Sequence, residues 1–302
     1  MCLVIVGYKI HPGYPLIITA NRDEYRSRPT ERPAWWENGQ DIFAGKDLTA
    51  GGSWLGVNRR GWFAAVTNYR EGARMQVPNT LSRGALVTDY LTGELQPEAF
   101  LLRLSERAHL YSGFNLLLSD GQDMYYFSNR EGIIRQLEPG LYGLSNHLLD
   151  SPWPKVVRAK AAAEKVITTN HPDVGALFAL MRDTSQPPDN QLPDTGVGLS
   201  VERRLATAFI DLEDLNYGTR VTTVLLQDNQ QQMYWEERSF TPGDEPVIEL
   251  ITPVTTLNII SSLWIPKPLY GWWSACRLAF YAVRKWWHRT PPPSFVRMTP
   301  SA

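Results

Sequence analysis

The stretch Leu16-Ile17-Ile18-Thr19-Ala20-Asn21-Arg22-Asp23-Glu24 decides how this chain is interpreted, because an apolar run passes directly into four polar residues. The branched and apolar side chains at its start are typical of a packed strand. Side chains alternate along a strand, so Asn21 and Asp23 would share one face, with Arg22 and Glu24 on the other. Charges at the end of an apolar strand are costly unless they are paired or have a chemical task. The structural alternative is a solvated strand end with a local ion pair.

Cys2 is a candidate nucleophile near that stretch. It follows Met1, and removal of an initiator methionine would leave Cys2 as the first residue. Its thiol could then act as a nucleophile and its own α-amine as the base, since the reference pKa of that amine is about 7.7–8.0. The apolar run Leu3-Val4-Ile5-Val6 would hold this terminus in a sheet. A buried, inert cysteine in a first strand is the alternative.

The composition favours a globular protein without nucleic-acid or disulfide chemistry. The chain has 302 residues, 43% of them hydrophobic and 20% charged, with a formal net charge of -1, so it carries no electrostatic footprint for nucleic acid. Its two cysteines, Cys2 and Cys276, form neither a disulfide framework nor a zinc motif. No signal peptide is visible. We therefore expect a cytoplasmic protein with no metal site and no cofactor.

The pattern of the chain predicts strands, two helices, strands, two helices and strands. Residues 2–8 and 16–22 form a hairpin signal. Helices are predicted from apolar spacing over 82–95, 97–108, 154–168 and 174–182. Further strands are predicted at 55–58, 62–68, 114–118, 124–127, 140–147, 206–210, 220–226 and 233–236, whereas 26–33 and 186–198 are interpreted as loops.

This order predicts an α+β fold, a four-layer αββα sandwich of two antiparallel sheets with helix pairs outside. Neither βαβ alternation nor a glycine-rich nucleotide fingerprint is present. We expect one domain over residues 1–245, followed by a proline-punctuated tail over 246–302.

Many short motifs together resemble the NRDE family, which is also called the transport and Golgi organisation protein 2 family. The resemblance covers roughly residues 1–240 in family order. It is carried by Cys2, Asn21-Arg22-Asp23-Glu24, Arg28-Pro29-Thr30, Ala44-Gly45-Lys46-Asp47, Gly51-Gly52-Ser53-Trp54-Leu55-Gly56-Val57, Thr67-Asn68-Tyr69-Arg70, Ser82-Arg83-Gly84, Gly113-Phe114-Asn115-Leu116-Leu117, Tyr142-Gly143-Leu144-Ser145-Asn146, Pro152-Trp153-Pro154-Lys155 and Tyr217-Gly218-Thr219-Arg220. More distantly, Cys2 and the Arg and Asp after the second strand resemble N-terminal nucleophile hydrolases, in particular bile-salt hydrolases and penicillin V acylases.

The resemblance implies catalytic roles around the first strand. Cys2 would be the nucleophile, Arg22 would hold its thiolate by charge, and Asp23 would orient the freed α-amine. Asn21 and Glu24 would line the ligand pocket. A nearby cation and a free ammonium favour a thiolate, so we expect the pKa of Cys2 to be lowered.

The resemblance also assigns three residues at other strand ends. Asn68 and Asn146 would donate to an oxyanion, and Arg220 would hold a substrate carboxylate or the nucleophile pocket. Each could instead make a hydrogen bond that only stabilises the fold.

Three functions follow as competing hypotheses. The first is an N-terminal-cysteine amidohydrolase or acyl hydrolase acting on an amide, a thioester or another acyl ligand. The second is a non-catalytic carrier of haem, acyl-CoA or a related amphipathic ligand, because family members have been linked to haem trafficking and to acyl-CoA handling. An adaptor with a vestigial pocket is the third.

The tail contains a segment, Tyr270 to Arg289, that is free of proline and predicts a helix. At helical spacing, its tryptophans and other apolar residues fall on one arc and its basic residues on the other. Such a helix suits the surface of an anionic membrane, whereas its charges argue against a membrane crossing. Packing of the aromatic face on the domain or on a second subunit is the alternative.

We expect the full-length protein to sediment with anionic liposomes and a chain cut after Pro268 to lose this binding. Added salt should weaken the binding, because part of the attraction is between charges. Binding that survives the truncation would contradict this expectation. A change from dimer to monomer would support the packing alternative.

Overall fold

The computed structural model describes residues 2–37, 41–72, 80–240 and 247–254, the last segment as backbone only. Within these residues the chain forms two antiparallel seven-stranded sheets. The first has the order β10-β1-β2-β12-β13-β14, with β11 paired to β12, and the second has the order β3-β4-β5-β6-β7-β8-β9. The two N-terminal strands therefore lie inside the first sheet, between β10 and β12.

The bounds of the strands agree with most of the predicted runs. In the first sheet they are β1 Cys2–Tyr8, β2 Leu16–Tyr25, β10 Gly140–Leu144, β11 Asp211–Leu212, β12 Tyr217–Gln227, β13 Met233–Ser239 and β14 Val247–Val254. In the second sheet they are β3 Thr30–Trp35, β4 Ile42–Asp47, β5 Leu55–Asn58, β6 Phe63–Asn68, β7 Phe114–Ser119, β8 Met124–Ser128 and β9 Ile134–Gln136.

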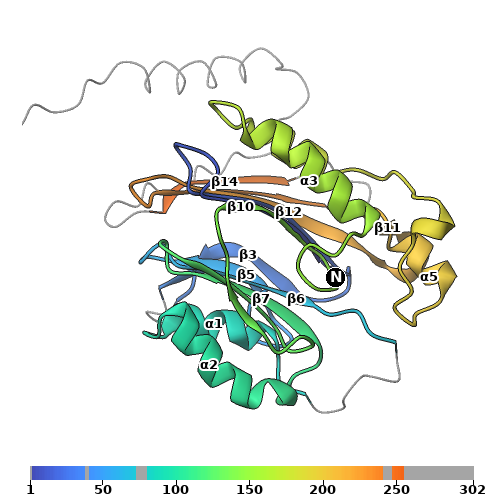
Figure 1. The fold of residues 1–302 in the computed structure, drawn as a ribbon, viewed down its shortest axis with the longest axis horizontal. Helices are drawn as coiled ribbons and strands as arrows, with labels where there is room; N and C mark the ends of the chain where they lie inside the picture. The colour runs from blue at the N-terminus through green and yellow to red at the C-terminus, as the bar shows by residue number, and fades with distance from the viewer. Residues whose placement is uncertain (1, 38–40, 73–79, 241–246, 255–302) are drawn as a thin grey trace, which may run out of the picture. The chain divides into compact units, whose positions relative to one another are not determined.

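The helices form the two outer layers. Their bounds are α1 Gly84–Thr92, α2 Pro97–Arg107, α3 Pro154–Ile167, α4 Val174–Leu180 and α5 Leu199–Arg204. In the described part of the chain, short 3-10 turns cover Ala108–Leu110, Asp189–Gln191 and Glu213–Leu215. In Figure 1, α1 and α2 lie below the sheet that contains β5, β6 and β7, and α3 lies above the sheet that contains β10 and β12.

Three apolar clusters hold these layers together. One lies between the sheets and combines residues of both, such as Val4 and Ile18 with Phe63 and Leu117. The second packs α1 and α2 on the second sheet, and the third packs α3 and α4 on the first sheet. The four-layer αββα sandwich of two antiparallel sheets is therefore confirmed.

The structure corrects two of the predicted elements and adds a helix that was not predicted. Residues 26–33 are not all loop, because β3 begins at Thr30 and pairs with β4 despite its arginine and proline. Residues 206–210 are not a strand: Ala208 and Phe209 both donate their backbone N–H to the Asp183 carbonyl, which bends the chain. The sequence pattern also gave no sign of α5.

The end of the described chain differs from the expected boundary. β14 pairs with β13 through residue 254, so the sheet continues past residue 245, where we expected the domain to end. The predicted helix from Tyr270 to Arg289 lies outside the described residues. Among the residues that are described, none of the helices is long and apolar enough to cross a membrane.

Candidate functional site

Cys2 begins β1 and lies opposite Arg22 of β2 in the antiparallel register. Val4 and Val6 belong to the cluster between the sheets, whereas Leu3 and Ile5 belong to the cluster under α3. Alternation therefore directs the side chain of Cys2 toward the space between the sheets. The residue is only 7% exposed, and its carbonyl accepts a hydrogen bond of 2.9 Å from the Ser145 hydroxyl. The candidate nucleophile is thus fixed by the sheet and by the residue that follows β10.

The protonation of Cys2 differs from the expectation. Burial raises the pKa of the thiol to about 11, the carboxylates of Asp23 and Glu24 act in the same direction, and Arg22 lowers it. Desolvation disfavours the charged thiolate more than the two nearby positive groups, the N-terminal amine and Arg22, favour it. The resting thiol is therefore neutral, and any nucleophilic role requires a base at the moment of attack.

Alkylation of Cys2 in the folded protein should consequently be slow. A pKa of about 11 in place of 9.0 reduces the thiolate fraction at pH 7.5 roughly 100-fold. We expect iodoacetamide to label Cys2 at least tenfold more slowly in native than in urea-unfolded protein, as followed by peptide mass spectrometry. Equal rates in both states would contradict the buried, neutral thiol.

Asp23 lies on the other face of β2, as the alternation predicted. It is 1% exposed, and one of its carboxylate oxygens accepts a hydrogen bond of 2.7 Å from the Thr219 hydroxyl. Burial raises the pKa of Asp23, while the charge of Lys155 and the bond from Thr219 lower it. The Tyr217 hydroxyl donates to the Asp23 carbonyl at 3.1 Å. Asp23 is therefore part of a buried polar cluster and not of a solvated strand end.

Arg22 and Glu24 form the partly exposed face of the same strand. An Arg22 guanidinium nitrogen lies 3.7 Å from a Glu24 carboxylate oxygen, and the two side chains are 11% and 24% exposed. Their charges act on Cys2 in opposite directions. The pair therefore forms a polar rim beside the thiol.

The side chain of Asn21 makes hydrogen bonds that connect parts of the fold. Its side-chain amide donates to the carbonyls of Met181 and Ala208, both at 2.8 Å, and its oxygen accepts from the Thr222 hydroxyl at 2.6 Å. All of its side-chain polar atoms thus connect β2 to β12 and to the segments around α4. A ligand-binding role for Asn21 remains a prediction that none of these contacts supports.

Asn68 and Asn146, far apart in the sequence, are brought together. The Asn146 side chain donates to the Asn68 carbonyl at 3.0 Å, and Asn146 itself is fully buried. Asn68 is partly exposed at the end of β6, and its side-chain amide has no hydrogen-bond partner among the described residues. Of the two, Asn68 retains a free amide donor, whereas Asn146 holds the strand end in place.

Arg220 occupies a β-bulge. The register between β12 and β2 shifts between Thr219 and Val221, which leaves Arg220 as the extra residue. Its guanidinium donates to the carbonyls of Arg28 and Tyr25. It therefore holds the turn after β2, and its predicted contact with a substrate carboxylate stays a prediction.

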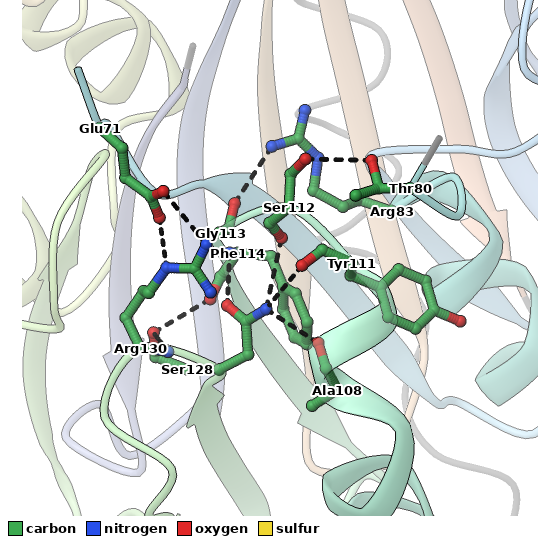
Figure 2. A network of polar contacts seen from close by, with 11 residues as sticks. Glu71, Thr80, Arg83, Ala108, Tyr111, Ser112, Gly113, Phe114, Ser128 and Arg130 are labelled. Carbon is green, nitrogen blue, oxygen red and sulfur yellow. Dashed lines mark hydrogen bonds and ion pairs between the residues drawn. The ribbon is translucent and has the colours of Figure 1, made fainter. Parts of the chain in front are cut away.

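Arg83 is a site residue to which the sequence assigned no role. Burial lowers the pKa of Arg83, and the charges of Cys2 and then Glu24 act in the opposite direction. Figure 2 shows its guanidinium directed at the Gly113 carbonyl, a hydrogen bond of 3.1 Å. Gly52 permits this position, since a Cβ there would lie 2.4 Å from the backbone of Gly84 at the start of α1.

A network next to Arg83 fixes the carbonyl that it contacts. Figure 2 shows Arg130 paired with Glu71 next to Gly113. The Asn129 side-chain oxygen accepts from the Phe114 N–H at 2.8 Å. The Asn129 amide donates to three backbone carbonyls, those of Ala108, Tyr111 and Ser112. The network anchors the turn before β7 and thereby Gly113.

Three further charged residues are buried next to Asp23. Arg70 pairs with Glu202 at 2.5 Å, and Lys155, in the first turn of α3, donates to the Leu205 carbonyl at 3.1 Å. All three are less than 10% exposed. Burial and then the charge of Arg70 lower the pKa of Lys155 to about 8, although Asp23 raises it. Each residue except Glu202 lies in a motif quoted above, but nothing in the motifs indicated that they meet.

No group of three or more His, Cys, Asp or Glu side chains that could hold a metal ion exists within the described residues. The chemistry that this site can perform is therefore argued from the thiol of Cys2, the charged groups around it and the amide of Asn68.

The fold and the site define a class of protein: an αββα sandwich with a buried cysteine beginning a strand beside charged residues. The chain belongs to the transport and Golgi organisation 2 family, whose model matches residues 1–242. It is 33% identical to the mouse transport and Golgi organization 2 homolog, over 85% of this chain and 100% of that protein. It is 34% identical to the human homolog, over 81% and 95%.

Similar solved structures include two hydrolases. Penicillin V acylase from Agrobacterium tumefaciens matches 82% of this chain and 84% of its own, with 14% identity and a TM-score of 0.46. A C2A mutant of conjugated bile acid hydrolase from Clostridium perfringens matches 86% of this chain and 100% of its own, with 9% identity and a TM-score of 0.44.

Proposed function

We propose that this protein is an acyl hydrolase that uses Cys2 as the nucleophile, acting on an amide or a thioester. The single observation that supports it best is the position of Cys2. This residue begins a central strand, faces the space between the sheets and lies opposite Arg22, with the charges of Glu24 and Arg83 acting on it. The proposal requires that Cys2 be the first residue of the mature chain.

In the first step the thiol attacks the carbonyl carbon of the substrate. The C–S bond forms while the α-amine of Cys2 takes the thiol proton, because a neutral thiol with a raised pKa needs a base in the transition state. Asp23, buried on the neighbouring strand end, would orient the resulting ammonium by charge. The carbonyl π electrons become an oxyanion.

The oxyanion needs a donor, and Asn68 is the candidate with a free amide. Donors aimed at a developing charge are worth about 2.7–4 kcal/mol each. Asn146 would act as a positioning residue through its bond to the Asn68 carbonyl. The intermediate then collapses: the C–N or C–S bond to the leaving group breaks, and the leaving group takes the proton from the ammonium. Water attacks the remaining thioester, releases the carboxylic acid and restores the thiol.

A non-catalytic carrier of an acyl or amphipathic ligand is the second candidate. The observation that favours it is the burial of Cys2, which keeps the thiol neutral. A carrier would use the partly exposed cations Arg22 and Arg83 to bind an anionic head group and would not need the thiol. Acyl-CoA and haem both carry such groups.

The two functions are separated by incubating the full-length protein with octanoyl-CoA and, separately, with octanoyl p-nitroanilide. Intact-mass and peptide analysis should find one octanoyl group on Cys2 of the wild type and none on Cys2→Ala, with product released only by the wild type. Equal non-covalent binding to wild type and Cys2→Ala, without adduct or product, would overturn the hydrolase and support the carrier.

The variant Arg83→Met tests the cation beside the thiol in the same assay. It removes the charge and keeps an unbranched side chain, so it should weaken the binding of octanoyl-CoA without preventing the adduct on Cys2. Unchanged binding of octanoyl-CoA would show that Arg83 does not contact the ligand.

A further inference from the structure

A small cavity lies among the buried charged residues described above. Its charged walls are Arg70, Lys155 and Glu202. Its volume, measured for the centre of a water-sized molecule, is about 10 Å³, which is roughly the space of one water molecule or one small ion. Trp153 and Leu205 are among its apolar walls.

The guanidinium of Arg70 has donors that nothing among the described residues satisfies. Its Nη1 donates to Glu202, and its guanidinium carbon lies 4.7 Å from the centre of the Trp153 ring. Its Nε and Nη2 are buried and have no hydrogen-bond partner in the described part of the chain. Leaving a buried donor unpaired is costly, most of all on a charged group that cannot lose its proton.

Glu202 does not satisfy these donors. One of its carboxylate oxygens accepts both the N–H and the hydroxyl of Thr195, at 2.9 and 2.5 Å, and the other accepts from Arg70. Glu202 is also held in α5, 2% exposed. Both carboxylate oxygens of Glu202 therefore already accept hydrogen bonds from Thr195 or from Arg70 Nη1.

The ammonium group of Lys155 is a second cation whose hydrogen-bond donors are not all satisfied. Its ammonium group donates to the Leu205 carbonyl, and the residue is 2% exposed. An ammonium has three hydrogens to donate. The walls of the cavity thus carry two cations and one carboxylate. Asp23 acts on Lys155 and Arg70 by charge but is not part of the walls.

We propose that this cavity binds a small monoanion, either a halide ion or the carboxylate group of a ligand, between Arg70 and Lys155. Such an anion would accept from the unpaired guanidinium nitrogens and from Lys155, and it would balance the excess positive charge of the walls. A water molecule would also accept these hydrogen bonds, but it carries no charge that would attract both cations. The site is independent of whether Cys2 is catalytic.

The test is thermal unfolding of the full-length protein in sodium bromide and in sodium formate. Ionic strength is held constant with sodium methanesulfonate, whose anion is too large for the cavity. We expect Tm to rise with bromide or formate and to saturate, because a ligand of the folded state stabilises it by mass action. Saturation by bromide alone identifies a free ion, saturation by formate alone identifies a ligand carboxylate, and saturation by both identifies a site open to either.

Lys155→Met removes one cation and retains a similar shape, and Lys165→Met, on the exposed side of α3, is the matched control. The apparent affinity for the anion should fall at least tenfold in Lys155→Met and stay unchanged in Lys165→Met. If Lys155→Met does not fold, anomalous diffraction from wild-type crystals soaked in bromide replaces it, with a peak expected between Arg70 and Lys155. No saturable shift with either anion would overturn the proposal, as would a bromide peak without any stabilisation in solution.

Discussion

Replacing Glu202 with alanine should destabilise the protein by about 3–5 kcal/mol, the range found when one partner of a buried ion pair is removed. The side chains of Glu202 and Arg70 are 2% and 6% exposed. The variant leaves the Arg70 guanidinium buried without its carboxylate. Arginine stays protonated in proteins, so this cost cannot be avoided by a change of ionisation. Urea unfolding at pH 7 measures the effect.

The matched control is Glu164→Ala, an exposed glutamate on α3. Its stability should change by no more than about 0.5 kcal/mol. A loss in Glu202→Ala that is as small as that of the control would show that Arg70 reaches solvent. The buried cluster and the anion site next to it would then both be wrong.

Replacing Asp23 with alanine should also destabilise the protein, but by an amount that depends on pH. The charges of two carboxylates, Asp23 and Glu202, act on Lys155. At pH 6 the variant removes one of the two from the protonated Lys155, and we expect a loss of about 3 kcal/mol. Lys155 has a pKa of about 8 in the folded protein. Above that pH it is neutral with or without Asp23, so the loss should shrink to the hydrogen bond from Thr219, about 1 kcal/mol.

Asp23→Asn is the control, because it preserves the acceptor for Thr219 and removes only the charge. It should be less stable than the wild type at pH 6 and close to it at pH 9. Unfolding curves for both variants at the two pH values give the answer. A loss below about 1 kcal/mol at pH 6 would place Asp23 at a solvated strand end.

Local pattern predicted much of the fold. The alternation along Asn21-Arg22-Asp23-Glu24 placed each side chain on its observed face, since Asn21 and Asp23 are buried and the other two are partly exposed. Helical spacing placed α2 and α3 within a residue or two of their ends. These elements are governed by contacts between near neighbours in the sequence, which periodicity reports directly.

The rest of the site depends on contacts across the chain. Arg70, Lys155 and Glu202 meet only because the loop after β6, the start of α3 and α5 pack together, and no spacing in the sequence records that. The bulge at Arg220 shifts that side chain away from the position that simple alternation gives. We expected the pKa of Cys2 to be lowered, but burial raises it. The burial of a residue depends on the packed fold and cannot be derived from its neighbours in the sequence.

The most direct test of the central proposal is the intact mass of the purified, untreated protein. The mechanism needs the α-amine of Cys2 as its base, so we predict a chain that begins at Cys2, with Met1 removed. A chain that retains Met1 has that nitrogen in a peptide bond, where it cannot accept the thiol proton. Full retention of Met1 in active protein would contradict Cys2 as an N-terminal nucleophile.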